Sequence, residues 1–229
     1  SIPTAVPPLT FLRVKRPEPD RDSLLRVFFA DRDGVIITAE GKTGVVRTGA
    51  EDIKLSPRGT LVYRHQGPSA GAADGGFARG AARQKAEELL RERSGLPADA
   101  RPDFAVPLGD GSRYKVEYVQ HREGLPVFSG RISLTVSAAG VEQLTADWLI
   151  LEGASGASKK VIPATEALLR LAGHLEAEDE QGVIFESIQL GYYSPAYDAE
   201  EWDVPPVWRV RTAADETYYI NAFTGELEG

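Results

Sequence analysis

The residues that could do acid–base or metal chemistry are few in this sequence. Cysteine is absent, so thiolate metal sites, disulfides and cysteine nucleophiles are excluded. The histidines are His65, His121 and His174, and no two of them stand at a spacing that one helix face or one turn could aim at a metal. We therefore interpret the three histidines as structural residues and predict neither a metal site nor a cofactor.

Carboxylates are more numerous than histidines, but their settings do not favour catalysis. Asp31-Arg-Asp-Gly34 opens like a calcium-binding loop but lacks the later oxygen ligands and the distal glutamate, so a hairpin turn is favoured. Two acidic clusters could in principle cleave glycosides, but only inside an enclosed cleft that keeps one carboxyl group protonated. Both lie in polar, loop-like runs, which favours solvated charge, with loose calcium binding at the second cluster as the alternative. The clusters are Glu176, Glu178, Asp179 and Glu180, then Asp198, Glu200, Glu201 and Asp203.

Other catalytic signatures are missing from the sequence. There is no Gly-x-Ser-x-Gly elbow to expose a serine nucleophile and no glycine loop with a lysine to cradle phosphate. The net charge of −8 and the lack of a basic, aromatic-laced stripe make nucleic acid an unlikely partner class. The sequence therefore predicts a protein that is not an enzyme and does not bind nucleic acid.

Aromatic residues form the segment with the most functional promise. Tyr192, Tyr193, Tyr197 and Trp202 crowd a proline- and acid-rich stretch before Val207. Aromatic side chains anchor protein interfaces because they bring a large contact area at a small entropic cost. The alternative is that Tyr192 and Trp202 cover the core of the C-terminal lobe. These four residues are the predicted partner-binding site, and both interpretations remain open at this point.

The N-terminal part predicts β-structure followed by one helix. Residues 1–22 are rich in proline, which favours an extended spacer, with an edge strand at Leu9–Val14 as an equal alternative. Alternating apolar residues and the Asp33-Gly34 turn predict strands between Leu24 and Tyr63. A flexible loop is expected at Gly67–Gly76, and helical spacing predicts a helix over residues 78–94 that ends near Gly95.

The rest of the chain repeats the order of a helix followed by strands. Alternation predicts antiparallel strands around Tyr114–Tyr118, Ile132–Val136 and Val141–Leu151. Gly153–Ser158 is the expected linker, and a helix over 163–175 precedes strands at 182–193, 207–212 and 217–222. The predicted class is α+β, with two lobes of antiparallel sheet that each carry a helix on one face, plus extra N-terminal β-structure. The predicted domains are 1–22, 23–152 and 153–229.

Two segments resemble the strand pairs of PepSY-type modules. One is Tyr118-Val-Gln-His-Arg-Glu-Gly-Leu-Pro-Val-Phe-Ser-Gly-Arg131, with a glutamine before the turn and a Gly-Arg strand start. The other is Trp208-Arg-Val-Arg with Tyr218-Tyr-Ile-Asn-Ala-Phe-Thr-Gly-Glu226, where aspartate is more usual in place of Asn221. The resemblance implies a tandem of PepSY-like modules over about residues 78–229.

The C-terminal part of the chain resembles the end of YycI proteins in four blocks: Val161–Leu171, Leu190-Gly-Tyr-Tyr193, Pro205-Pro-Val-Trp208 and the closing Tyr-Tyr-Ile-Asn-Ala. That resemblance implies an extracytoplasmic regulator that binds the cell-wall sensor histidine kinase system (WalK/YycG type), together with a YycH-type partner. It also implies anchoring to the cell membrane by an N-terminal helix. No run of about 20 apolar residues is present and methionine is absent, so we expect that helix upstream of Ser1. A PepSY-type peptidase inhibitor or propeptide is the alternative.

Overall fold

A computed structural model describes residues 6–17, 36–40, 43–47, 51–56, 59–65, 77–93, 97–177, 182–195 and 199–228. The expected Asp33-Gly34 turn, the Gly67–Gly76 loop and the helix end near Gly95 lie outside these residues. The described residues form fourteen strands and two helices. The helices are α2 (Arg79–Arg93) and α3 (Ala164–Ala177). The strands are β1 (Leu9–Lys15), β2 (Ile36–Glu40), β3 (Thr43–Arg47), β4 (Glu51–Leu55), β5 (Leu61–His65), β6 (Ala100–Leu108), β7 (Arg113–Arg122), β8 (Leu125–Ser137), β9 (Gly140–Asp147), β10 (Ile150–Lys159), β11 (Phe185–Tyr192), β12 (Glu201–Val204), β13 (Pro206–Thr212) and β14 (Thr217–Asn221).

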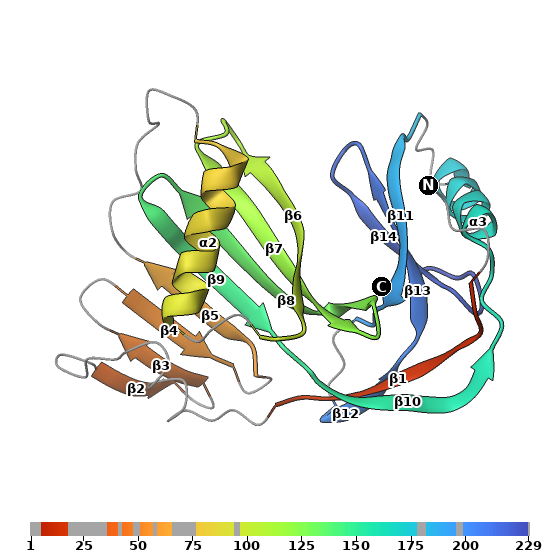
Figure 1. The fold of residues 1–229 in the computed structure, drawn as a ribbon, viewed down its shortest axis with the longest axis horizontal. Coiled ribbons are helices and arrows are strands. Elements are labelled where there is room, and N and C mark those ends of the chain that lie inside the picture. The colour runs from red at the N-terminus through yellow and green to blue at the C-terminus, as the bar shows by residue number, and fades with distance from the viewer. Residues whose placement is uncertain are drawn as a thin grey trace. The chain divides into compact units, whose positions relative to one another are not determined.

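The predicted α+β class with two helix-covered lobes is wrong, because the described chain is mostly β-structure (Figure 1). Both helices lie where helical spacing placed them, and Leu9–Lys15 is strand β1, in agreement with the strand alternative for Leu9–Val14. Gly153–Ser158, in contrast, is part of β10 rather than a linker. Glycine, alanine and serine show no strand pattern in sequence, so β10 is specified by its backbone pairing with β1 rather than by side-chain alternation.

The chain divides into two compact units that are discontinuous in sequence. Unit 1 contains residues 1–15, 122–129 and 149–229. Unit 2 contains residues 16–121 and 130–148. Strand β8 contributes to both, because its first residues belong to unit 1 and the rest to unit 2.

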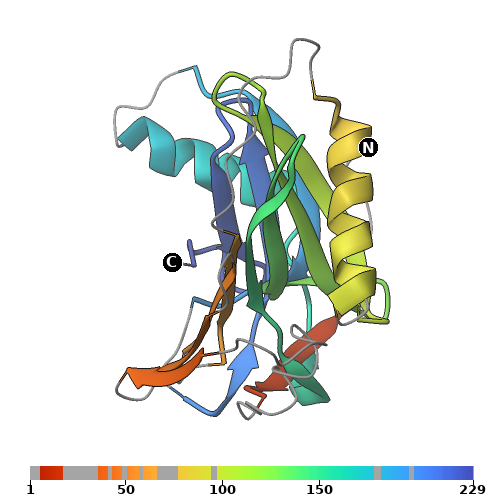
Figure 2. The same cartoon turned by 90° about the vertical axis from the view of Figure 1, so that its left-hand side faces the viewer.

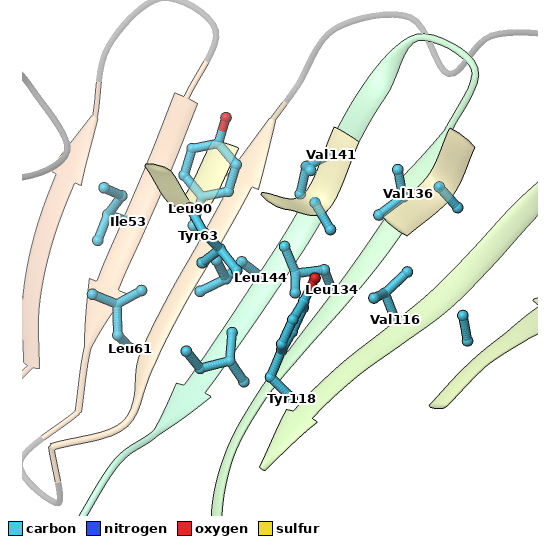
Figure 3. Close-up of a cluster of buried hydrophobic side chains, with 14 of the residues drawn as sticks. Ile53, Leu61, Tyr63, Leu90, Val116, Tyr118, Leu134, Val136, Val141 and Leu144 are labelled. Carbon is cyan, nitrogen blue, oxygen red and sulfur yellow. The ribbon is translucent and has the colours of Figure 1, made fainter. Parts of the chain in front are cut away.

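Unit 2 is a sheet in the order β2-β3-β4-β5-β9-β8-β7-β6, with α2 lying along it (Figure 2). The helix buries Ala82, Ala86 and Leu90 in one apolar core with the sheet residues. Figure 3 shows the centre of this core, where Tyr118 and Leu134 are among the buried side chains. Alternation along the strands predicted this face, because every second side chain points towards the helix.

A close approach inside unit 2 explains the Gln and Gly of the first PepSY-like segment. Gln120 is buried and donates a 2.8 Å hydrogen bond to Asp99 Oδ2. A Cβ atom at Gly130 would lie 2.2 Å from Gln120 Oε1 and 3.0 Å from Gln120 Cβ. Glycine at position 130 therefore leaves room for a buried amide that fastens the start of β6 to β7.

In unit 1, α3 packs on a sheet of β11, β13 and β14 (Figure 1). Both strand pairs in this sheet are antiparallel. Leu171 of α3 and Trp208 of β13 are buried together, and Trp208 Nε1 donates a 2.9 Å hydrogen bond to the carbonyl of Ile162. The helix and sheet thus share one apolar core, in which the helix contributes the face predicted from its spacing.

A second sheet of unit 1 has the order β10-β1-β12, with β1 antiparallel to both neighbours. Leu12 and Val14 of β1 are buried beside Val127, Tyr192 and Val204. The N-terminal segment is therefore held on both edges and contributes to a core. Neither helix in the described ranges is long and apolar enough to cross a membrane.

Candidate protein-interaction site

The structure describes three of the four aromatic residues predicted to bind a partner. Tyr192 ends β11 and is only 8% exposed, in the core that also holds Val14 and Val204. Trp202 of β12 packs against the same core. Tyr193 is half-buried, and Tyr197 lies outside the described residues. Tyr192 and Trp202 thus have the core position that was the alternative, whereas Tyr193 remains accessible.

Tyr192 is placed by a close contact between β11 and the start of β8. It pairs with Val127 in parallel register, and the preceding Gly191 lies against Pro126 and Phe128, where a Cβ would be 2.5 Å from the Pro126 carbonyl oxygen. Burial raises the pKa of the Tyr192 hydroxyl, and nearby Glu123 raises it further. A neutral hydroxyl in this setting indicates a packing role rather than acid–base chemistry.

Trp202 is oriented by a pair of serines. Its indole Nε1 donates a 2.9 Å hydrogen bond to Ser194 Oγ. The hydroxyl of Ser129 donates to the Ser194 carbonyl and accepts from the Ser194 amide, both at 3.0 Å. These bonds link Trp202 of β12 and Ser194 to Ser129 of β8.

Tyr193 belongs to an aromatic ladder that only the tertiary structure brings together. Its ring stacks on Tyr219 of β14, with centroids 3.6 Å apart and planes 9° from parallel. Tyr219 contacts Phe128 at 5.7 Å, and the Arg209 guanidinium lies 4.2 Å from the Phe128 ring centroid. Arg209 also donates a 2.7 Å hydrogen bond to Gln189.

We missed Tyr219, Phe128 and Arg209 as site residues from the sequence. Strand alternation carried part of the signal, because Tyr218 and Ile220 pack on the α3 side, so Tyr219 must face the other side of the sheet. The contact with Tyr193 could not be derived, since it depends on how the segment after β11 runs past β14.

The second acidic cluster is partly neutralised inside unit 1. Arg13 of β1 forms ion pairs with Glu201 at 2.6 Å and with Asp203 at 2.5 Å. The Arg13 hydrogen bond lowers the pKa of the Asp203 carboxyl group below its usual value. Asp198 lies outside the described residues, as do Glu178, Asp179 and Glu180 of the first cluster. Glu201 and Asp203 therefore link β12 to β1 through Arg13, which is a structural role.

The three histidines come from different elements, β5, β7 and α3. His65 and His174 are exposed, and His121 Nδ1 lies 3.3 Å from the Val119 carbonyl oxygen. Across the described ranges, no group of three or more histidine, aspartate or glutamate side chains could hold a metal ion.

Charge is distributed unequally between the units. Unit 1 contains eight lysines and arginines against sixteen aspartates and glutamates, whereas unit 2 contains eighteen of each class. The whole net charge of −8 therefore belongs to unit 1, which also carries the aromatic ladder.

Comparison with known proteins shows a family and a fold. Residues 38–223 match the family model described as YycI protein. A crystal structure of an uncharacterized protein from Eubacterium rectale ATCC 33656 is 12% identical with a TM-score of 0.57, over 98% of this chain and 86% of that chain. The Bacillus megaterium YpeB C-terminal domain is 13% identical with a TM-score of 0.50, over 93% and 96% of the two chains. At these identities the likeness concerns the fold alone. No curated protein matches this chain.

Proposed function

Because the chain belongs to the YycI family, a family of regulatory accessory proteins of the YycG/WalK sensor kinase system, we propose that it acts by binding and modulating that system without catalysing a reaction. The predicted YycI resemblance is confirmed by the family match over residues 38–223. We propose that it works outside the cytoplasm, held at the membrane by a helix upstream of Ser1. The sensor histidine kinase and a YycH-type protein are the proposed partners.

The observation that carries the proposal is the stack of Tyr193 on Tyr219. Two tyrosine rings 3.6 Å apart are already ordered, so a partner that contacts them loses little side-chain entropy on binding. Tyr193 retains its predicted role as a contact residue, and Tyr197 and Trp202 belong to the same segment. Tyr192 is only 8% exposed, so its proposed contribution is to the core that supports Tyr193 rather than to direct contact with the partner.

The proposal is tested by measuring whether this chain binds the extracytoplasmic domains of the sensor kinase and of the YycH-type protein. We expect a complex in size-exclusion chromatography with light scattering, and a dissociation constant measurable by calorimetry. Tyr193→Ala should weaken binding by more than about 1 kcal/mol if the residue is an interface anchor. Tyr218→Ala is the matched control, because Tyr218 packs on the α3 side of the same sheet. Absence of a complex with either partner, alone or combined, would refute the proposed function.

A further inference from the structure

We propose that the Tyr193–Tyr219 stack docks a basic segment of a partner protein, with an arginine or lysine of that segment lying on the outer face of Tyr193. This inference rests on the proposed function, since it names the chemistry of the partner at the site that the function requires. Three observations support it: the geometry of the stack, the charge of unit 1, and an arginine–aromatic contact already present in the same ladder.

The stack has an inner ring and an end ring. Tyr219 lies between two rings, because it stacks on Tyr193 and contacts Phe128. Tyr193 is the end ring among the described residues, where it stacks on Tyr219 and is half-buried rather than enclosed. The face of an aromatic ring carries partial negative charge, so a cation is the group that extends such a stack most favourably.

The net charge of unit 1 has the sign that attracts a cation. Unit 1 carries twice as many acidic as basic residues. The Glu228 amide donates to the Tyr219 carbonyl at 2.8 Å, while the Glu228 carboxylate accepts a 2.6 Å hydrogen bond from Asn221 Nδ2. Glu123 raises the pKa of neighbouring Tyr192 while Arg122 lowers it, and Glu200 is an exposed carboxylate of the same unit.

Several basic residues of unit 1 are already engaged within it. Arg13 pairs with Glu201 and Asp203, and Arg170 pairs with Glu166. Lys159 lies over the rings of Phe11 and Phe223. The acidic surplus of unit 1 therefore has to be balanced from outside, by counterions or by a basic partner.

The other end of the ladder shows the same contact inside the molecule. Arg209 places its guanidinium 4.2 Å from the Phe128 ring centroid, while Gln189 accepts one of its hydrogen bonds. Phe128 in turn contacts Tyr219. A partner arginine on Tyr193 would therefore complete an arrangement in which a cation closes each end of one aromatic ladder.

A peptide titration tests the inference directly. The probes are a fluorescein-labelled decapeptide of alternating Arg and Ser and its counterpart of alternating Glu and Ser, with binding to the full chain followed by anisotropy. We expect the Arg peptide alone to bind, and its affinity to fall as salt rises from about 50 to 500 mM, because exposed charges are screened. Tyr193→Ala should weaken binding about two- to five-fold, whereas Tyr193→Phe should retain it because the ring face persists.

Two further variants serve as controls, and circular dichroism must confirm that Tyr218→Ala is folded because Tyr218 packs against the α3 core. Glu200→Lys changes an exposed side chain and should weaken the Arg peptide without changing the melting temperature. Tyr218→Ala, on the opposite face of β14, should leave binding unchanged. Equal binding of the Arg and Glu peptides, or an Arg peptide that is insensitive to Tyr193→Ala, would overturn the inference. The kinase or YycH-type domain could instead form a complex whose affinity changes neither with salt nor with Tyr193→Ala. That result would overturn the inference while leaving the proposed binding function intact.

Discussion

Replacing Gly191 by alanine adds one methyl group at the closest contact between β11 and β8. The new Cβ would lie 2.5 Å from the Pro126 carbonyl oxygen, 2.6 Å from Phe128 Cε2 and 2.8 Å from Pro126 Cγ. Ordinary van der Waals contacts for such an atom begin near 3.4 Å. The nearest obstacle is backbone, so it cannot be relieved by rotating a side chain, and the two segments must separate.

The expected cost is about 1–3 kcal/mol, the range for overpacking a close-packed interior. Gly191 is not among the residues with positive φ, so the loss would be steric rather than conformational. For a chain of 229 residues this corresponds to a fall in melting temperature of roughly 2–12 °C. Separation of β11 from β8 also disturbs the core around Tyr192. Urea unfolding followed by tryptophan fluorescence measures the effect, because Trp202 packs on that core.

Gly173→Ala is the matched control for Gly191→Ala. Gly173 is an exposed helical residue of α3, and a Cβ there would meet nothing within 4 Å. Alanine in place of glycine inside a helix stabilises by up to about 1 kcal/mol. The same chemical change should therefore have opposite signs at the two positions. If Gly191→Ala is as stable as the unsubstituted protein, the close approach of β11 and β8 described above is refuted.

Three further outcomes are expected. Leu171→Ala should lower the unfolding free energy by about 2–5 kcal/mol because the Leu171 side chain is 1% exposed. Leu169→Ala is the control: its side chain is 75% exposed, so the unfolding free energy should change by less than about 0.5 kcal/mol. Equal effects of the two variants in chemical denaturation would mean that α3 packs through another face. Arg13 lowers the pKa of Asp203 in the folded state, so this ion pair contributes stability that is complete above the ordinary value of 3.8 and is lost as the pH falls through the lowered value. Denaturation between pH 7 and 2 should show that loss, and Arg13→Gln should reduce it; an unchanged pH profile in the variant would argue against the pair. Thermal melts with and without a chelator should coincide, since three scattered histidines and no cysteine offer no structural metal site. If the chelator lowered the melting temperature by about 10 °C or more, this prediction would be wrong and calcium binding at the second acidic cluster would be favoured.

Local patterns in the sequence determined both helices and the sides of the strands that face the cores. Ala82, Ala86 and Leu90 recur at helical spacing and are buried by α2, and Leu171 occupies the same kind of position in α3. These features are predictable because a helix or strand repeats its geometry over a few residues, so the chain's own periodicity records which side is buried. The blocks that resemble YycI proteins were likewise visible in the sequence, and the family match confirms them.

Other features depended on segments that are distant in the chain. Gly153–Ser158 has a linker's composition and becomes part of β10 because β1 supplies backbone hydrogen bonds across more than a hundred residues. The pairing of β1 with β12 likewise joins distant segments, and it brings Arg13 to Glu201 and Asp203.

The candidate site shows the same division between local and tertiary information. The sequence marked Tyr193 as one of several aromatic residues, but its stacking partner Tyr219 lies in another strand and was identified only in the folded chain. Tyr192 and Trp202, adjacent to it in the same segment, turned out to support a core instead. Composition can show that a segment is rich in contact-forming side chains. Which of them face a partner is decided by the neighbours that the fold brings against each ring, because burial is a property of the whole packing and not of the local sequence.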